Sequence, residues 1–152
     1  DALPIWGEGG ADAPGPRCRF LGTRMIYTSG VIKDITRKET LEELQDNKLA
    51  LVCHKLELKP TDTLLDIGCG WGTLSAYANK NFGCDVTGVT LGKNQTAFGN
   101  KRILDNGCDT GKARILCKDF RDVGNGKKFS KIVSLEMAEV GVPTQSLYAA
   151  EC

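Results

Sequence analysis

Three alternating glycines between residues 68 and 72 form the pattern in this chain with the clearest chemical meaning. A short apolar run, Thr63-Leu64-Leu65-Asp66-Ile67, precedes Gly68-Cys69-Gly70-Trp71-Gly72, and a second apolar run begins at Thr73. This order predicts a buried strand, a tight loop and a helix. Glycine permits turns that a side chain would block, and the N-terminus of a helix attracts negative groups. Such a loop suits the carboxylate or phosphate of a cofactor.

The spacing of the glycines indicates which cofactor to expect. A dinucleotide loop of the form G-x-G-x-x-G would need its third glycine at Thr73, whereas this chain has G-x-G-x-G with Asp66 two residues before the first glycine. That spacing matches loops that bind S-adenosylmethionine. A short glycine motif is also compatible with a plain structural turn, so the choice depends on the neighbouring residues.

Composition limits the class of protein. With 152 residues, of which 41% are hydrophobic and 26% charged, the chain is expected to form one globular domain. A net charge of +1 without long Lys/Arg runs gives no reason to expect a nucleic acid partner. Seven cysteines without a C-x-x-C pair, together with a single histidine, argue against a disulfide framework or a zinc site and for a reducing compartment. We therefore expect a soluble intracellular chain and, because it begins with Asp1, a fragment or a processed product.

The N-terminal part is expected to be an irregular lead-in (residues 1–24) followed by a helical segment (residues 25–60). The lead-in is rich in glycine and proline and has no hydrophobic period. Capping boxes at Thr36 and Thr40 each offer a helix start, and Pro60 ends the run. The residues expected on the apolar face are Leu41, Leu44, Leu51, Val52 and Leu56. We expect Cys53 to face the core and His54 to lie on the surface.

Strands and helices then alternate. The expected elements are a helix from Thr73 to about residues 81–83, a strand at 85–91, a helix at 93–106, a strand at 113–117 and a strand at 129–135. This alternation predicts an α/β protein with a parallel, doubly wound sheet of order 3-2-1-4 and ligands at the carboxyl ends of the strands. After the fourth strand only one short helix is expected, so the fold is predicted to be truncated there.

Polar residues at the strand ends could bind the rest of the cofactor. At the end of the second strand, Thr90 and Gln95 are available for the ribose hydroxyls. After the third strand, Asp119 could accept a hydrogen bond from the adenine amine while Phe120 packs against the ring. The alternative for Asp119 is a solvated loop carboxylate, and for Glu136 a solvated or capping role is favoured over a role as a substrate-side acid.

Four motifs from Met25 to Glu139, in order and at plausible spacing, carry a resemblance to a known family. They are Tyr27-Thr28-Ser29-Gly30, residues 64–72, residues 85–95 and Ser134-Leu135-Glu136-Met137-Ala138-Glu139. Together they resemble the cyclopropane-fatty-acid synthase family and, within it, the fungal sphingolipid C9-methyltransferases.

The resemblance implies a Rossmann-like fold of the S-adenosylmethionine-dependent methyltransferases, with residues 61–141 forming half of the cofactor-binding domain. The cofactor positions that it implies are Tyr27, Thr28, Leu64, Leu65, Asp66, Ile67, Gly68, Cys69, Gly70, Trp71, Gly72, Thr90, Leu91, Gly92, Lys93, Asn94, Gln95, Asp119 and Phe120. Members of the family add a methyl group to a carbon–carbon double bond of a lipid, and the fungal branch acts on a ceramide. The resemblance also implies bicarbonate as the base, with Glu139 at the position of the glutamate that helps to hold it.

Some features depart from the family pattern. The family has a histidine directly after the glutamate, whereas Glu139 is followed by Val140-Gly141, and residues 142–152 look like a tail from outside the family. The membrane segments of the fungal enzymes, which the resemblance associates with a membrane surface and the endoplasmic reticulum, are not in this sequence. An exposed sheet edge is expected to favour self-association. Because the second half of the family fold and the histidine are missing, the chain by itself is expected to be inactive. The alternatives left open are a cofactor-binding fragment without catalysis and a methyltransferase of another small-molecule class.

Overall fold

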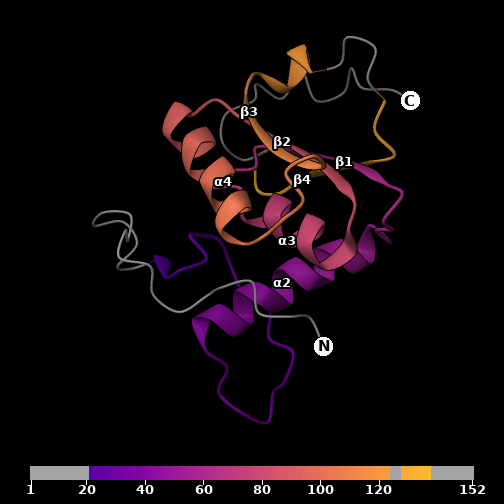
Figure 1. Cartoon of the computed structure of the whole chain (residues 1–152). Helices are drawn as coiled ribbons and strands as arrows, with labels where there is room; N and C mark the ends of the chain where they lie inside the picture. Colours follow the sequence, from indigo (N-terminus) through magenta and orange to yellow (C-terminus); the bar gives the residue numbers. More distant parts are fainter. Residues whose placement is uncertain (1–20, 124–127, 138–152) are drawn as a thin grey trace, which may run out of the picture.

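The computed structural model describes residues 21–123 and 128–137 (Figure 1). Its elements are α2 (Leu41–Lys55), β1 (Thr63–Ile67), α3 (Thr73–Phe82), β2 (Asp85–Thr90), α4 (Lys93–Asp105), β3 (Ala113–Cys117), the 3-10 helix η1 (Phe120–Asp122) and β4 (Lys131–Ser134). The expected alternation of strands and helices is confirmed. β4 is shorter than the strand predicted at 129–135.

The four strands form one parallel sheet of order β3-β2-β1-β4, as the sequence predicted. Leu64 of β1 pairs with Val86 of β2 and with Lys131 of β4, and Val86 pairs with Ala113 of β3. Because parallel strands end at a common edge, β1, β2, β3 and β4 present the residues that follow them on the same side of the molecule.

Both core clusters lie on one face of the sheet. The first joins Leu49 of α2 and Tyr77 of α3 to Leu64, and the second joins Ile103 of α4 to Ala113. In the described part of the chain, α2, α3 and α4 all cover this face (Figure 1). Right-handed crossovers that proceed in one direction, from β1 to β2 to β3, place their helices on the same side. The β3–β4 connection reverses that direction, and its described part contains η1.

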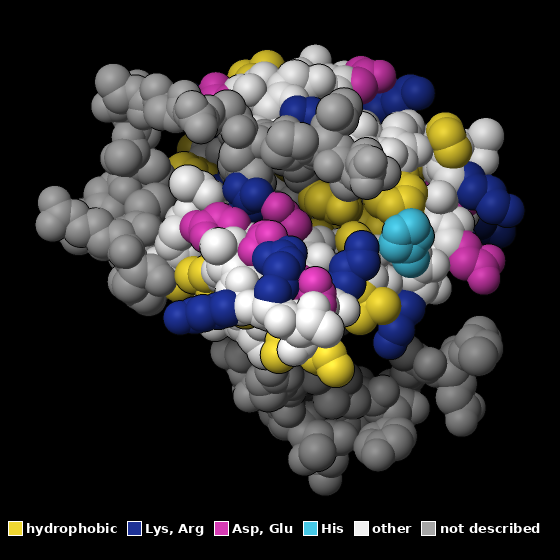
Figure 2. All heavy atoms as spheres, turned by 90° about the horizontal axis from the view of Figure 1, so that it is seen from below, with side chains coloured by type: hydrophobic (Ala, Val, Ile, Leu, Met, Phe, Trp, Pro, Cys, Tyr) yellow, Lys and Arg dark blue, Asp and Glu magenta, His cyan; other side chains and the backbone are white. Residues whose placement is uncertain are grey.

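Helix α2 begins where one of the two capping boxes predicted. The Thr40 hydroxyl accepts from the backbone N–H of Glu43, and the Glu43 carboxylate accepts from the backbone N–H of Thr40. The Thr36 hydroxyl instead donates to Asp34 ahead of the helix. Arg37 forms ion pairs with Asp34 and Glu39 in the same region. Figure 2 shows positive and negative side chains interspersed on the face of the molecule that it views.

The predicted apolar face of α2 is confirmed only in part: Val52 and Leu56 pack against the core, but other members of that face do not. Leu41 is 44% exposed and Leu51 is 41% exposed, while the buried residues are Gln45, Leu49 and Cys53. The reason is the segment before the helix: the Gln45 side-chain amide donates to the Thr28 carbonyl at 2.7 Å, which turns this face inward. Cys53 in the core confirms one expectation, and the exposed His54 confirms another.

The N-terminal segment packs against the domain through buried residues. Leu21 and Arg24, the first and fourth residues described, are both buried. The Arg24 guanidinium forms a two-bond ion pair with Asp46 of α2, at 2.8 and 2.5 Å. None of the helices within residues 21–123 and 128–137 is both long enough and apolar enough to cross a bilayer.

Candidate cofactor site

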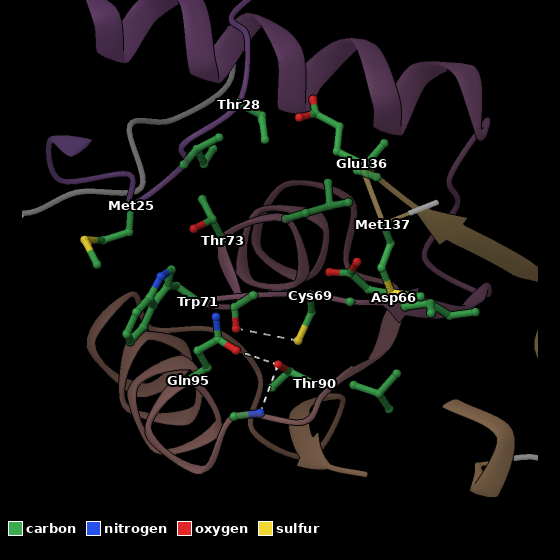
Figure 3. A pocket seen from close by; sticks show the side chains of 18 of the residues that line it. Met25, Thr28, Asp66, Cys69, Trp71, Thr73, Thr90, Gln95, Glu136 and Met137 are labelled. Atoms are coloured by element: carbon green, nitrogen blue, oxygen red, sulfur yellow. Dashed lines mark hydrogen bonds between the residues drawn. The ribbon is translucent and has the colours of Figure 1, made fainter. Parts of the chain in front are cut away.

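A pocket of about 410 Å³ lies at the carboxyl ends of the strands (Figure 3). Its walls come from residues 25–28, from Lys48 and Leu49 of α2, from the glycine loop, from the residues after β2 and β3, and from residues 135–137. The volume falls in the range of small-molecule and cofactor pockets. The pocket therefore combines segments that are far apart in the sequence around the glycine loop.

The structure brings most of the predicted cofactor positions to this pocket. Those that line it are Tyr27, Thr28, Asp66, Ile67, Gly68, Cys69, Gly70, Trp71, Thr90, Leu91, Gly92, Gln95, Asp119 and Phe120. Leu64 and Leu65 are buried in the sheet, and Lys93 and Asn94 are exposed at the start of α4. Gly72, the last glycine of the loop, packs against α4, where a Cβ would approach Gly99 Cα at 3.1 Å. Glu139, the predicted catalytic residue, lies outside the described residues.

The glycine loop turns with positive φ at Gly68 (+72°), Gly70 (+54°) and Gly72 (+75°). The backbone N–H groups of Gly68 and Cys69 both donate to the Val89 carbonyl at 3.0 Å, which ties the loop to the end of β2. A Cβ added at Gly70 would meet no protein atom within 4 Å. Because Gly70 lines the pocket, bare backbone here borders open space of the kind a ligand fills.

Asp66 is the buried charge of the site. Its side chain is almost fully buried beside the pocket, where the Ser75 hydroxyl donates to Oδ2 at 2.7 Å. Burial raises the pKa of the Asp66 carboxyl to about 6, although the Ser75 hydrogen bond acts in the opposite direction. Desolvation therefore outweighs the hydrogen bond, and a ligand cation in the pocket would stabilise the ionised carboxylate.

Thr90 and Gln95, the residues expected to hold the ribose hydroxyls, meet at the end of β2. The Thr90 hydroxyl donates to Gln95 Oε1 at 2.7 Å and accepts from the backbone N–H of Gly92 at 3.4 Å (Figure 3). One side chain comes from the last residue of β2 and the other from the first turn of α4. The pair offers a hydroxyl and an amide to the same part of the pocket, which suits a diol.

Asp119 lines the pocket and also caps η1. Its carboxylate accepts from the backbone N–H of Arg121 at 2.9 Å and from the Arg121 guanidinium at 2.7 and 2.9 Å. These contacts lower the pKa of Asp119 to about 2. The side chain is therefore an ionised acceptor, held by its neighbour rather than simply solvated. Phe120, the next residue, also lines the pocket.

Sequence reasoning missed an ion pair at the pocket. Lys48 of α2 binds Glu136, which follows β4, at 2.6 Å, and it also donates to the Thr28 hydroxyl at 2.5 Å. Glu136 is exposed, which agrees with the solvated role favoured for it, but its carboxylate also forms an ion pair that the sequence did not indicate. The only available signal was the place of Lys48 on α2, next to the buried Leu49 and one turn from the buried Gln45.

Arg102 of α4 is a second residue that sequence reasoning missed. Its buried guanidinium donates to the carbonyls of Thr23, Arg24 and Trp71 at 3.1, 3.2 and 3.3 Å and to the Thr73 hydroxyl. It also lies 4.9 Å from the centre of the Phe98 ring. Arg102 thereby fastens the segment that leads to Tyr27 and Thr28 against the glycine loop. The sequence could have indicated this role, because Arg102 is a charged residue on the same helix face as Gly99 and Ile103, which is the buried face of α4.

The sheet order, the glycine loop at the end of β1 and the pocket built around it define the fold of the S-adenosylmethionine-dependent methyltransferases. Solved structures agree with this class. The cyclopropane synthase MmaA2 from Mycobacterium tuberculosis is 35% identical with a TM-score of 0.69, covering 79% of this chain and 40% of that one. The mycolic acid cyclopropane synthase CmaA1, solved with SAH and CTAB, is 31% identical with a TM-score of 0.66, covering 76% and 39%.

The chain belongs to the mycolic acid cyclopropane synthetase family, whose model matches residues 18–151. Sphingolipid C9-methyltransferase A of Emericella nidulans is 62% identical over 127 residues, which cover 81% of this chain and 24% of that protein. Sphingolipid C9-methyltransferase 1 of Gibberella zeae is 57% identical over 134 residues, which cover 88% and 26%. The chain thus spans about a quarter of the length of these curated relatives.

These matches confirm the family that the sequence motifs indicated. The cyclopropane-fatty-acyl-phospholipid synthase of Escherichia coli is also similar, at 38% identity over 133 residues, which cover 87% of this chain and 32% of that protein. The region matched by the family model continues past Gly141, where we expected the family pattern to end.

Proposed function

We propose that this chain is the cofactor-binding part of an enzyme that transfers a methyl group from S-adenosylmethionine to a carbon–carbon double bond of a lipid. The proposed substrate is the unsaturated sphingoid base of a ceramide, methylated at C9. One observation carries the substrate class: six relatives that are 52–62% identical to the chain are named sphingolipid C9-methyltransferases. The cyclopropane-fatty-acyl-phospholipid synthase of Escherichia coli is less similar, at 38% identity, so the sphingolipid enzymes are the better guide to the substrate.

The residues of the pocket fit S-adenosylmethionine, which would supply an electrophilic methyl group. The open space over Gly70 leaves room for the amino-acid part, and the buried Asp66 carboxylate would bind its ammonium group. Thr90 and Gln95 would hold the ribose hydroxyls. Asp119 would accept from the adenine amine while Phe120 packs against the ring.

The chain's own task in this reaction is to bind, align and exclude water. Apolar side chains, among them Met25, Leu49, Leu135 and Met137, form much of the pocket wall. Attack by an alkene needs no nucleophilic side chain, but it needs close alignment and a dry site in which positive charge on the lipid is not captured by water. An apolar wall beside the glycine loop supports that requirement.

For the base that removes the final proton we propose a bound bicarbonate held in part by Glu139. This assignment is supported by the match of Glu139 to the family glutamate. We also propose that the whole protein works at a membrane surface, at the endoplasmic reticulum, because a ceramide resides in a bilayer. CmaA1, crystallised with the lipid-like detergent CTAB, supports a lipid acceptor.

A methyl-transfer assay tests the proposed reaction. The full-length protein that contains this chain is incubated with labelled S-adenosylmethionine and a ceramide. The ceramide has either an unsaturated or a saturated sphingoid base. We expect label only in the unsaturated ceramide, with a rate at least about 100-fold lower in Glu139→Gln, because the bicarbonate that acts as the base would lose a group that holds it. Equal labelling of the saturated ceramide would contradict the proposal. Binding of S-adenosylhomocysteine without transfer to any lipid would favour a cofactor-binding fragment.

We propose that the isolated chain self-associates through β4. β4 is an edge of the described sheet, and Ile132 at its centre is 58% exposed. Unprotected edges invite pairing, and a lysine on an edge strand suppresses it. In sedimentation velocity we expect the wild-type chain to associate as concentration rises and Ile132→Lys to remain monomeric. Ile35→Lys is the matched control, because Ile35 is 91% exposed in the loop before α2. A monomeric wild type, or an equal effect of Ile35→Lys, would contradict this proposal.

A further inference from the structure

Three polar side chains from distant parts of the chain meet at one side of the pocket. The Lys48 ammonium donates to the Thr28 hydroxyl oxygen at 2.5 Å and to Glu136 Oε1 at 2.6 Å. The side chain of Lys48 is 12% exposed and that of Glu136 is 34% exposed. All three residues line the pocket. This cluster lies apart from the Thr90 and Gln95 pair, and Figure 3 shows Thr28 and Glu136 on the opposite side of the pocket from that pair.

The contact with Lys48 fixes the hydrogen-bonding role of Thr28. An ammonium group can only donate, so the Thr28 oxygen is the acceptor in their hydrogen bond. The single proton of the Thr28 hydroxyl must then point to an acceptor other than Lys48. A hydroxyl that accepts from a cation is also a stronger donor, because hydrogen bonds in a chain polarise one another. Thr28 is thus prepared to donate to an anionic acceptor.

Glu136 holds Lys48 in place from the other side. Its backbone adopts φ of +53°, a left-handed conformation that is unfavourable for a residue with a Cβ. The ion pair with Lys48 joins this residue, in the loop after β4, to α2. The Lys48 side chain is therefore fixed by a carboxylate and directed toward Thr28.

The charges around the pocket match a zwitterionic ligand group. Asp66 supplies a buried negative charge beside the glycine loop, and Thr28 supplies a donor backed by the Lys48 ammonium. Lys118, the other cation among the described residues that line the pocket, adjoins Asp119 at the end assigned to adenine. An amino-acid group bound with its ammonium at Asp66 would find the matching donor for its carboxylate at Thr28.

We propose that Lys48 is a positioning residue that, through Thr28, selects the carboxylate of the cofactor's methionine part. This inference rests on the proposed function, because it assumes that the pocket binds S-adenosylmethionine. Lys48 acts by orienting and polarising the Thr28 hydroxyl and makes no contact with the ligand itself. The cofactor is thereby bound with its amino-acid group in one orientation, and an analogue without a carboxylate gains nothing from Lys48.

Calorimetry with two ligands tests this role. S-adenosylhomocysteine has the amino-acid part, and 5′-methylthioadenosine lacks it. In Lys48→Met and Thr28→Val we expect the affinity for S-adenosylhomocysteine to fall about tenfold, as for loss of one charge-assisted hydrogen bond, and the affinity for 5′-methylthioadenosine to change less than about twofold. Thr28→Ser keeps the hydroxyl and should bind both ligands like the wild type. Lys101→Met is the matched control, because it removes an exposed ion pair with Asp105 on α4, away from the pocket.

The double variant Thr28→Val/Lys48→Met separates positioning from direct contact. If Lys48 acts through Thr28, the double variant binds S-adenosylhomocysteine no more weakly than Thr28→Val alone. Additive losses would overturn the inference, because Lys48 would then contact the ligand itself. Wild-type affinity in Lys48→Met, or equal losses for both ligands, would also overturn it. A wild-type chain that binds neither ligand would instead refute the proposed function, and the inference with it.

Discussion

Replacing Gly70 by valine is expected to lower the affinity for S-adenosylhomocysteine more than about 100-fold. No protein atom lies within 4 Å of the Cβ position, so the added side chain would project into open space at a residue that lines the pocket. Its branched methyl groups would then occupy volume that the ligand needs, and steric exclusion of the ligand has a larger effect than loss of one hydrogen bond. Titration calorimetry measures the loss directly.

The matched control for this variant is Gly107→Val. Gly107 also has a positive φ, +64°, and its Cβ position also has no protein atom within 4 Å, but it lies after α4 and does not line the pocket. A branched residue at positive φ costs about 1–3 kcal/mol of folding stability at either position. We expect both variants to melt at lower temperature and only Gly70→Val to lose the ligand. Unchanged affinity in Gly70→Val would show that the glycine loop is not the binding site.

Asp66→Asn is expected to stabilise the ligand-free chain at neutral pH. The pKa of Asp66 is about 6 in the folded chain, above its ordinary value of 3.8. Below pH 4 the Asp66 carboxyl is protonated in both the folded and the unfolded chain, so its burial has no charge penalty. As the pH rises through 6 the folded chain must bury an ionised carboxylate, and its free energy of unfolding falls until the loss is complete at pH 7. At pH 7, burying the ionised Asp66 lowers the free energy of unfolding by on the order of 3 kcal/mol, and the uncharged asparagine of Asp66→Asn avoids this loss. Denaturant unfolding at pH 4 and pH 7 should show a gain only at pH 7.

The same substitution is expected to weaken binding of S-adenosylhomocysteine by about 10- to 100-fold, because the ligand's ammonium loses a charge-assisted hydrogen bond. Stability and affinity would then change in opposite directions. The control is Asp105→Asn on the exposed side of α4, which should alter neither quantity by much. A variant that is less stable than the wild type at pH 7, or that binds the ligand equally well, would contradict the role of Asp66 as a buried partner for a cation.

Local patterns in the sequence were sufficient to predict the sheet and the centre of the site. The glycine spacing, the strand periodicity and the helix end at Gly83, which has φ of +69°, are properties of neighbouring residues, and each appears in the structure. The sequence indicated Thr90 and Gln95 as available groups at the end of β2, and in the structure they also hydrogen-bond to each other. Short-range geometry determines these features.

Long-range contacts could not be predicted in the same way. Gln45 is buried in place of Leu41 because the backbone of Thr28 offers its amide a partner. Lys48 and Glu136 are 88 residues apart, and their ion pair depends on how α2 packs against the end of β4. A periodic pattern shows which face of a helix is apolar on average, but the neighbouring segments decide which face is buried.

The most direct test of the account is calorimetric titration of the chain with S-adenosylhomocysteine and, separately, with NAD. The glycine spacing, the buried Asp66 carboxylate and the Thr90 and Gln95 pair together predict one molecule of S-adenosylhomocysteine bound per chain and no binding of NAD. Binding of NAD without binding of S-adenosylhomocysteine would contradict the cofactor assignment, and with it the proposed methyl transfer.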